Sequence, residues 1–285
     1  MTTAPAAGGT AVYLYGVARG LDPAALRGAA GVAGAPVRGV VEGPLTALVS
    51  TVRLEEYGET ALRANLEDLA WLEATARAHH AVVDRAAHVA PTAPVAIATI
   101  YRDDARVAEV LAAQSARFRD VLDGVAGRSE WGVKAYAAPA PGPAAPEEPA
   151  THVPEPGGGL APSAEPLTGP TPAAEPGPGA GTAYLQARQR ERRRREDAAR
   201  RSAGHAREIH AALAGHAVAS RHHPPQDPRL SGRPGTQLLN AAYLLEEEKV
   251  EAFRAEAAAA ADRLPGVEVE VTGPWPPYSF IPESG

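Results

Sequence analysis

The chain of 285 residues contains no cysteine, which excludes disulfides, thiol catalysis and zinc fingers. It also has no basic excess, because 28 Lys and Arg against 34 Asp and Glu give a formal net charge of −6. That balance argues against a general binder of nucleic acid or of anionic membranes. No apolar run reaches the roughly 18 residues of a membrane-spanning helix. The first ten residues lack the basic and apolar regions of a signal peptide, so we expect a cytoplasmic protein.

Recognisable catalytic motifs are missing as well. The chain has no GxSxG nucleophile elbow and no HExxH metal motif. The sequence therefore predicts a protein that is not an enzyme, with no cofactor and no catalytic, cofactor-binding or metal-binding residues to assign. Histidines are the remaining candidates for a metal, since His80 and Asp84 lie four residues apart on a predicted helix, a spacing that can chelate. Without a supporting motif, solvated or locally hydrogen-bonded side chains are the favoured interpretation; the other candidates are His79, His205, His210, His222 and His223.

Three charged or glycine-rich segments also need an interpretation. Residues 177–182 (GPGAGT) precede a helix but lack the lysine and the preceding strand of a Walker motif, so a linker is favoured. Residues 191–196 (ERRRRE) are basic, but acids flank the arginines and no aromatic residue separates them. A solvated helix face, or a patch for an acidic protein partner, explains this run better than nucleic acid. Residues 246–248 (EEE) lie at a helix start, where negative charge is favourable.

Residues 10–137 predict a first α+β domain. Apolar or alternating runs indicate strands, and apolar residues spaced three and four apart indicate helices. The predicted strands are 11–17, 37–41, 45–52, 95–101 and 130–137, and the predicted helices are 61–88 and 103–122. The first strand can be covered on both faces, so we expect it to be central. Trp131, in the last of these strands, is expected to pack inside this first domain.

Residues 138–180 are rich in proline and glycine and have almost no large apolar side chain, which predicts a long disordered linker. A second α+β domain is expected over residues 181–285. Its predicted elements are a long helix from 184 to about 219, a strand at 237–245, a helix at 246–263 and an alternating strand at 266–271. The predicted fold class is α+β, with two small ferredoxin-like α/β-layer domains joined by a Pro/Gly-rich linker.

The chain ends in a stiff aromatic segment, residues 272–280 (TGPWPPYSF). Pro274 is expected to end the preceding strand, because proline has no N–H to donate to a sheet. The aromatic side chains of Trp275, Tyr278 and Phe280 would be costly to leave in water. We expect them to pack over the core of their own domain, with contact to a partner as the alternative.

Six short segments, taken in order, resemble the GvpL/GvpF family of gas vesicle proteins. They are AVYLYGVA at 11–18, AHHAVV at 78–83, RSEWGVKAY at 128–136, GTAYLQAR at 181–188, LLNAAYLL at 238–245 and TGPWPPYSF at 272–280. Each is weakly diagnostic alone, but their order and spacing are specific. One departure is that the family usually carries a run such as PLRFGTVF after the first long helix, where this chain has PVAIATIYRDD at 94–104. The long Pro/Gly-rich insert is a second departure.

The resemblance implies an accessory or minor structural protein of gas vesicles, located in the cytoplasm and at the vesicle. It implies a role in assembly through binding of the hydrophobic shell protein and other accessory proteins. The acidic charge balance predicts neither nucleic acid nor membrane as partner. Exposed sheet edges and rigid aromatic side chains suit a protein that binds another chain, for example by strand addition. The alternative is a non-enzymatic scaffold or adaptor whose basic helix binds an acidic protein or nucleic acid. High salt should abolish that binding and spare apolar binding.

Overall fold

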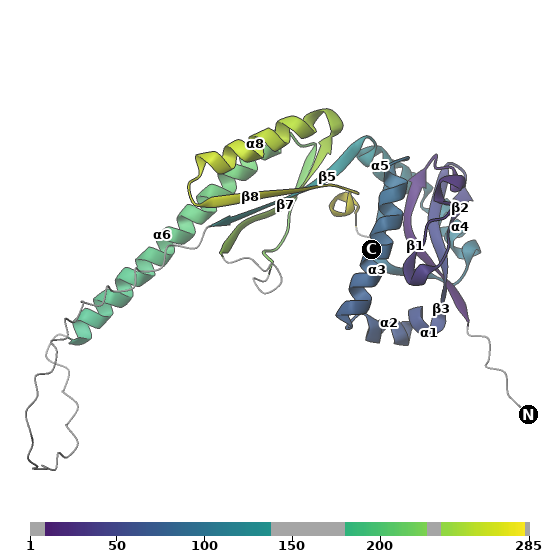
Figure 1. Ribbon diagram of the computed structural model, residues 1–285, viewed down its shortest axis with the longest axis horizontal. Coiled ribbons are helices and arrows are strands. Elements are labelled where there is room, and N and C mark those ends of the chain that lie inside the picture. Colours follow the sequence, from purple (N-terminus) through teal and green to yellow (C-terminus); the bar gives the residue numbers. More distant parts are fainter. Residues whose placement is uncertain (1–8, 138–179, 227–234, 283–285) are drawn as a thin grey trace, which may run out of the picture.

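The computed structural model describes residues 9–137, 180–226 and 235–282, which form two α+β units (Figure 1). Each unit is built on a four-stranded antiparallel sheet, with the strand orders β2-β3-β1-β4 and β6-β7-β5-β8. Within each unit the strands therefore follow the same order, second-third-first-fourth, which is that of a ferredoxin-like β-α-β-β-α-β unit. The predicted α+β class with two such sheets is confirmed.

The first sheet contains β1 (Thr10–Arg19), β2 (Val37–Glu42), β3 (Leu45–Arg53) and β4 (Thr92–Tyr101). β1 pairs with both β3 and β4 and is buried over almost its whole length, so the prediction of a central first strand is confirmed. β2 and β3 form the predicted hairpin, in which Glu42 is paired with Leu45. The turn needs glycine at Gly43, whose φ is 58°.

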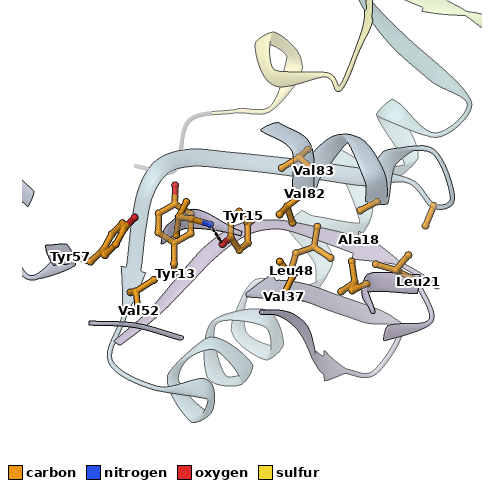
Figure 2. Packing of buried hydrophobic residues seen from close by; sticks show 14 of the residues in the cluster. Tyr13, Tyr15, Ala18, Leu21, Val37, Leu48, Val52, Tyr57, Val82 and Val83 are labelled. Carbon is orange, nitrogen blue, oxygen red and sulfur yellow. Dashed lines mark hydrogen bonds between the residues drawn. The ribbon is translucent and has the colours of Figure 1, made fainter. Parts of the chain in front are cut away.

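Helices cover both faces of the first sheet. On one face, Tyr13 and Tyr15 of β1 pack with Val82 and Val83 of α3 (Leu69–Ala87), as Figure 2 shows. On the other face, apolar residues of β1 and β3 form a core with α4 (Asp104–Ala113) and α5 (Ser115–Val125). Two short 3-10 helices, η1 (Pro23–Leu26) and η2 (Val32–Gly34), stand between β1 and β2, where a ferredoxin-like unit has its first helix.

The long helices predicted for this unit are interrupted. The region predicted as one helix over 61–88 contains α2 (Glu59–Asn65) and α3, preceded by α1 (Leu54–Tyr57). The carboxylate of Asp68 accepts hydrogen bonds from the backbone N–H groups of Ala70 and Trp71, so it caps and starts a new helix. The helix predicted over 103–122 is likewise divided at Gln114 into α4 and α5, and Asp103 caps α4 through the N–H of Arg106.

The second sheet contains β5 (Arg128–Ala137), β6 (Ala219–His222), β7 (Thr236–Glu246) and β8 (Val267–Trp275). Placing residues 130–137 in the first domain was wrong, because β5 lies between β7 and β8 in this second sheet. The predicted first domain, 10–137, therefore includes one strand too many. Trp131 is buried as predicted, with 6% of its surface exposed, but in the core of the second unit.

Two helices pack on the second sheet: α6 (Ala180–Ala214) and α8 (Val250–Arg263), the latter preceded by the 3-10 helix η3 (Glu247–Lys249). Ile209 and Leu213 of α6 and Phe253 of α8 are fully buried in its core. The predicted linker, residues 138–180, lies outside the described residues except at its last position. Its place in the chain is between β5 and α6, two elements of the same unit.

The end of β8 also differs from the prediction. Pro274 does not end the strand, which continues to Trp275, and the Gly273–Pro274 peptide bond is cis. β8 is an edge strand that pairs only with β5 in the sheet, so a residue without an N–H is tolerated there. Within the described parts of the chain, no helix is both long and apolar enough to cross a lipid bilayer.

Candidate functional site at the junction of the two units

The C-terminal segment, residues 275–282, runs from the second unit to the first. It begins at the end of β8 and includes the 3-10 helix η4 (Tyr278–Phe280). In Figure 1 it lies beside α3, where the two units meet. Ile281 packs against the core beneath α4 and α5, and the guanidinium of Arg117 in α5 donates a hydrogen bond of 3.2 Å to the carbonyl of Pro282. The segment therefore connects the units, and the prediction that it closes the core of its own domain alone was wrong.

Aromatic contacts fix this segment on α3. The ring of Trp275 lies 5.4 Å from that of His80, and the ring of Tyr278 lies 6.1 Å from His80 and 6.3 Å from His79. The prolines between them, Pro276 and Pro277, are buried. Burial raises the pKa of the Tyr278 hydroxyl well above its usual value, with smaller contributions from Tyr13 and from nearby acids. Trp275 and Tyr278 nevertheless keep 43% and 36% of their surfaces exposed.

A buried carboxylate holds the segment from the side of the second unit. Glu130 in β5 accepts two hydrogen bonds from Ser279, at 2.8 Å from the backbone N–H and at 2.6 Å from the hydroxyl. The Ser279 hydroxyl also lies 3.2 Å from Nε2 of His223. Burial raises the pKa of Glu130, and the bonds from Ser279 together with His223 and Arg221 oppose that shift. Along these hydrogen bonds the serine lies between the acid and the histidine. In a catalytic triad the histidine lies between the serine and the acid.

A second polar network lies in the first unit beneath Tyr278. The hydroxyl of Tyr13 accepts a hydrogen bond from the N–H of Ala98 and lies 3.0 Å from Nδ1 of His79. Burial is the main cause that lowers the pKa of His79 to about 4, so this histidine is neutral near pH 7. β4 bulges at this point, since its pairing with β1 resumes only at Thr99, and Ala98 has a left-handed φ of 66°. This bulge lies within the divergent segment 94–104, and Ala98 stands where the PLRFGTVF run has glycine.

An open groove of about 420 Å³ runs along the junction. Both units contribute to its walls, and charged side chains lie among the apolar ones. We call it the junction groove; its lining includes Asp84, His88, Val89, Arg128, Pro274 and Trp275. Val89, which follows α3, exposes 63% of its surface. Exposed valine and tryptophan in one concave surface are typical of a site for an apolar segment of another protein.

The histidines that were considered as metal ligands lie in different parts of the structure and contact other side chains. No group of three or more potential metal-binding side chains occurs in the part of the chain that the structure describes. His80 packs on aromatic rings, while Asp84 is 3.6 Å from His88. The rings of His210 and His222 are 4.4 Å apart, and Nδ1 of His210 lies 2.9 Å from the hydroxyl of Tyr243. These two histidines line a smaller pocket of about 200 Å³, which is formed chiefly by α6, β6 and β7.

The remaining sequence candidates lie apart from the junction. Residues 191–196 are on an exposed stretch of α6, and residues 177–179 fall outside the described residues. Glu246 forms an ion pair with Arg128 at 3.2 Å. Sequence reasoning did not find the roles of Glu130, Ser279 and Tyr13. A weak signal was available for Glu130, because an acid directly precedes a buried tryptophan in a strand.

Comparison with known proteins decides the family. The model of the family described as gas vesicle synthesis protein GvpL/GvpF matches residues 11–282. The chain belongs to the GvpL/GvpF family. Gas vesicle protein L from Streptomyces sp. (strain CB03234) is 38% identical over 268 residues, which cover 94% of this chain and 91% of that protein. GvpL/GvpF proteins belong to gas vesicle formation, so this chain has a part in that process.

The fold also has solved counterparts in the GvpL/GvpF family. The crystal structure of GvpF from Anabaena sp. PCC7120 is similar with a TM-score of 0.64 and 16% identity, over 97% of this chain and 98% of that one. GvpF from Microcystis aeruginosa gives a TM-score of 0.60 and 14% identity, over 95% of this chain and 99% of that one. At these identities the likeness shows that the two-unit fold is shared.

Proposed function

We propose that this protein acts in gas vesicle assembly by binding the hydrophobic shell protein, in company with other accessory proteins, without catalysing a reaction. Its place of action is then the cytoplasm and the growing vesicle. The junction groove carries the proposal, because it presents exposed apolar side chains from both units in one concave surface. Membership of the GvpL/GvpF family supports the vesicle context.

The groove suits an apolar segment that must be kept from aggregating. Val89 and Trp275 are already exposed, so a ligand gains contact with them without unfolding any part of the protein. Each large apolar side chain that becomes fully buried contributes about 1.5–3 kcal/mol. The charged side chains in the groove, Asp84, Arg128 and Glu247 among them, keep the empty groove compatible with water. Binding of this kind depends on apolar area and changes little with salt.

The test is retention of the shell protein by the purified full-length chain in 0.5 M NaCl, where charges are screened beyond about 4 Å. The variants Val89→Asp and Trp275→Ala should each weaken retention at least tenfold. Val41→Asp is the matched control, because Val41 is 54% exposed on β2, at the opposite edge of the first sheet from β4. Equal retention by all three variants, each with an unchanged melting temperature, would refute the groove as the binding site.

The adaptor function remains as a second candidate because one observation favours it. The side chains at positions 185–201 of α6 are all exposed, and this stretch includes every arginine of the ERRRRE run. Binding through this stretch should fall steeply as salt rises, in contrast to binding in the junction groove. Salt dependence therefore assigns a given partner to one of the two surfaces.

A further inference from the structure

The first part of α6 makes a surface with no role in the fold of its own unit. Figure 1 shows α6 extending beyond the second sheet, and burial begins only near its C-terminal end, at Ile209 and Leu213. A helix of 35 residues is about 52 Å long. We call residues 185–204 the arm.

The arm is strongly basic within an acidic protein. It holds eight arginines and three acidic residues, a formal charge of +5, so the rest of the chain carries −11. The three acids are used within the helix, where Glu191 pairs with Arg195, Glu196 with Arg192 and Asp197 with Arg200. These pairs support an isolated helix. Five arginines of the arm make no ion pair with another described residue: Arg188, Arg190, Arg193, Arg194 and Arg201.

A surface of opposite charge lies on the first unit. Residues 54–73, which span α1, α2 and the start of α3, contain six acids and one arginine, a formal charge of −5. We call this the acidic corner. Glu55 and Glu67 are exposed and make no ion pair with another described residue. The corner also exposes Leu54, Leu66 and Leu69, the last by 78%.

We propose that the acidic corner of one molecule binds the arm of a second copy of this chain. Arginine suits such a surface, because its alkyl stem covers exposed leucine while its guanidinium pairs with carboxylates. Leu185, 59% exposed at the start of the arm, adds an apolar contact. The formal charges of the two surfaces, +5 and −5, match.

The positions of the two surfaces determine the kind of assembly. In Figure 1 the arm and the corner lie at opposite ends of the molecule, so one molecule cannot join its own two surfaces. The contact is head-to-tail, and each molecule can bind one copy at each end. Such contacts give open chains of increasing length, or rings where the rotation between successive copies closes. This proposal goes beyond shell-protein binding and does not depend on it.

Nucleic acid fits the arm less well than a second copy does. The arm has no aromatic side chain for stacking on bases, and the remaining −11 of the chain repels a phosphate backbone. The acids in the arm, at positions 191, 196 and 197, would also face the phosphates. An acidic protein surface with some basic groups of its own matches this mixture better.

The test is the concentration-dependent mass of the full-length protein by analytical ultracentrifugation. We expect association in 50 mM NaCl that is at least tenfold weaker in 0.5 M NaCl. The arm variant R193E/R194E and the corner variant E55R/E67R should each remain monomeric. Mixing these two variants should restore association, because the unaltered corner of the arm variant can bind the unaltered arm of the corner variant. The control E248R/E251R has the same change in net charge as the corner variant, on exposed residues elsewhere, and should associate like the wild type.

Two results would overturn the proposal. One is a wild type that stays monomeric at low salt; if it then binds a labelled 20-mer DNA through the arm, the arm is assigned to nucleic acid. The second is failure of the mixed variants to associate while both keep the helical content and melting temperature of the wild type.

Discussion

Glu130 and Ser279 are joined by two hydrogen bonds although 149 residues separate them in the chain. Glu130 lies in β5, the strand that leads from the first unit into the second sheet. Ser279 lies in the segment that returns from the second sheet to α3. One buried carboxylate therefore fixes the C-terminal segment at the place where the two units meet.

We predict that Ser279→Ala loosens this segment. The variant loses the hydroxyl donor to a buried carboxylate, which should cost about 1.5–3 kcal/mol. Chymotrypsin should then cleave faster after Tyr278 and Phe280, as measured by mass spectrometry of the released C-terminal peptides. Ser202→Ala on α6 is the control and should be cleaved at the wild-type rate. Equal rates for both variants would show that the hydroxyl bond to Glu130 does not hold the segment.

The second prediction concerns acid sensitivity. His79 has a pKa lowered to about 4 in the folded protein, against an ordinary value of 6.5, so the unfolded chain binds more protons between these values. The contribution of the neutral histidine to the free energy of unfolding is complete above pH 6.5. As the pH falls toward 4, this contribution decreases by about 3 kcal/mol. Urea unfolding at pH 7 and pH 4.5 measures this loss.

A matched pair of variants isolates the contribution of His79. His79→Gln should reduce the loss of stability between pH 7 and pH 4.5, whatever its stability at pH 7. His88→Gln, whose wild-type side chain is 69% exposed, should leave the loss unchanged. If both variants lose as much stability as the wild type, His79 is not the group responsible.

The third prediction tests the bulge in β4. A left-handed backbone costs a non-glycine residue about 1–2 kcal/mol, and glycine adds about 0.5–1 kcal/mol of unfolded-state entropy. Ala98→Gly should therefore stabilise the protein by about 0.5–1 kcal/mol. Ala96→Gly, in the same bulge but without a positive φ, should be neutral or destabilising. The melting temperatures of the two variants are compared by thermal unfolding. A lower melting temperature for Ala98→Gly than for Ala96→Gly would show that the backbone at Ala98 is not strained.

The fourth prediction concerns the Pro/Gly-rich stretch between β5 and α6. Shortening it from 42 residues to about 20 should change the free energy of unfolding by only about 0.6 kcal/mol, the loop-closure term for a twofold change in length. Twenty residues still span about 66 Å when extended, longer than α6 itself. The melting temperature should stay within a few degrees of the wild type. A loss of cooperative melting would show that these residues contribute to the fold.

Most elements of the fold could be predicted from the sequence, because local periodicity marks them. β1, the β2–β3 hairpin and α8 follow from apolar spacing that depends only on near neighbours. For β7 that spacing allowed helix or strand, and the length and position of the segment favoured strand. The strand partner of β5 does not follow from local pattern. A signal was nevertheless present, since the predicted second domain held only two strands, and a two-stranded sheet is not stable alone. Adding residues 130–137 would have supplied the missing central strand.

The junction could be predicted only in part. The aromatic residues 275, 278 and 280 indicated a segment that must be buried against another surface. Their partners in α3, however, lie about 200 residues away in the chain. Periodicity shows that a surface is apolar and does not show which surface covers it. His79 and His80 illustrate the same limit, because the sequence favoured solvated or locally hydrogen-bonded side chains, and both instead pack beneath Tyr278 and Trp275.

The central claim is that vesicle assembly depends on the junction groove, and complementation tests it most directly. The measurement is vesicle formation, by electron microscopy, in a host that lacks this gene and has no redundant paralogue. We expect the wild type and Val41→Asp to restore vesicles, and the double variant V89D/W275A to give none or malformed ones while it accumulates as a folded protein. Normal vesicles with the folded double variant would contradict the account.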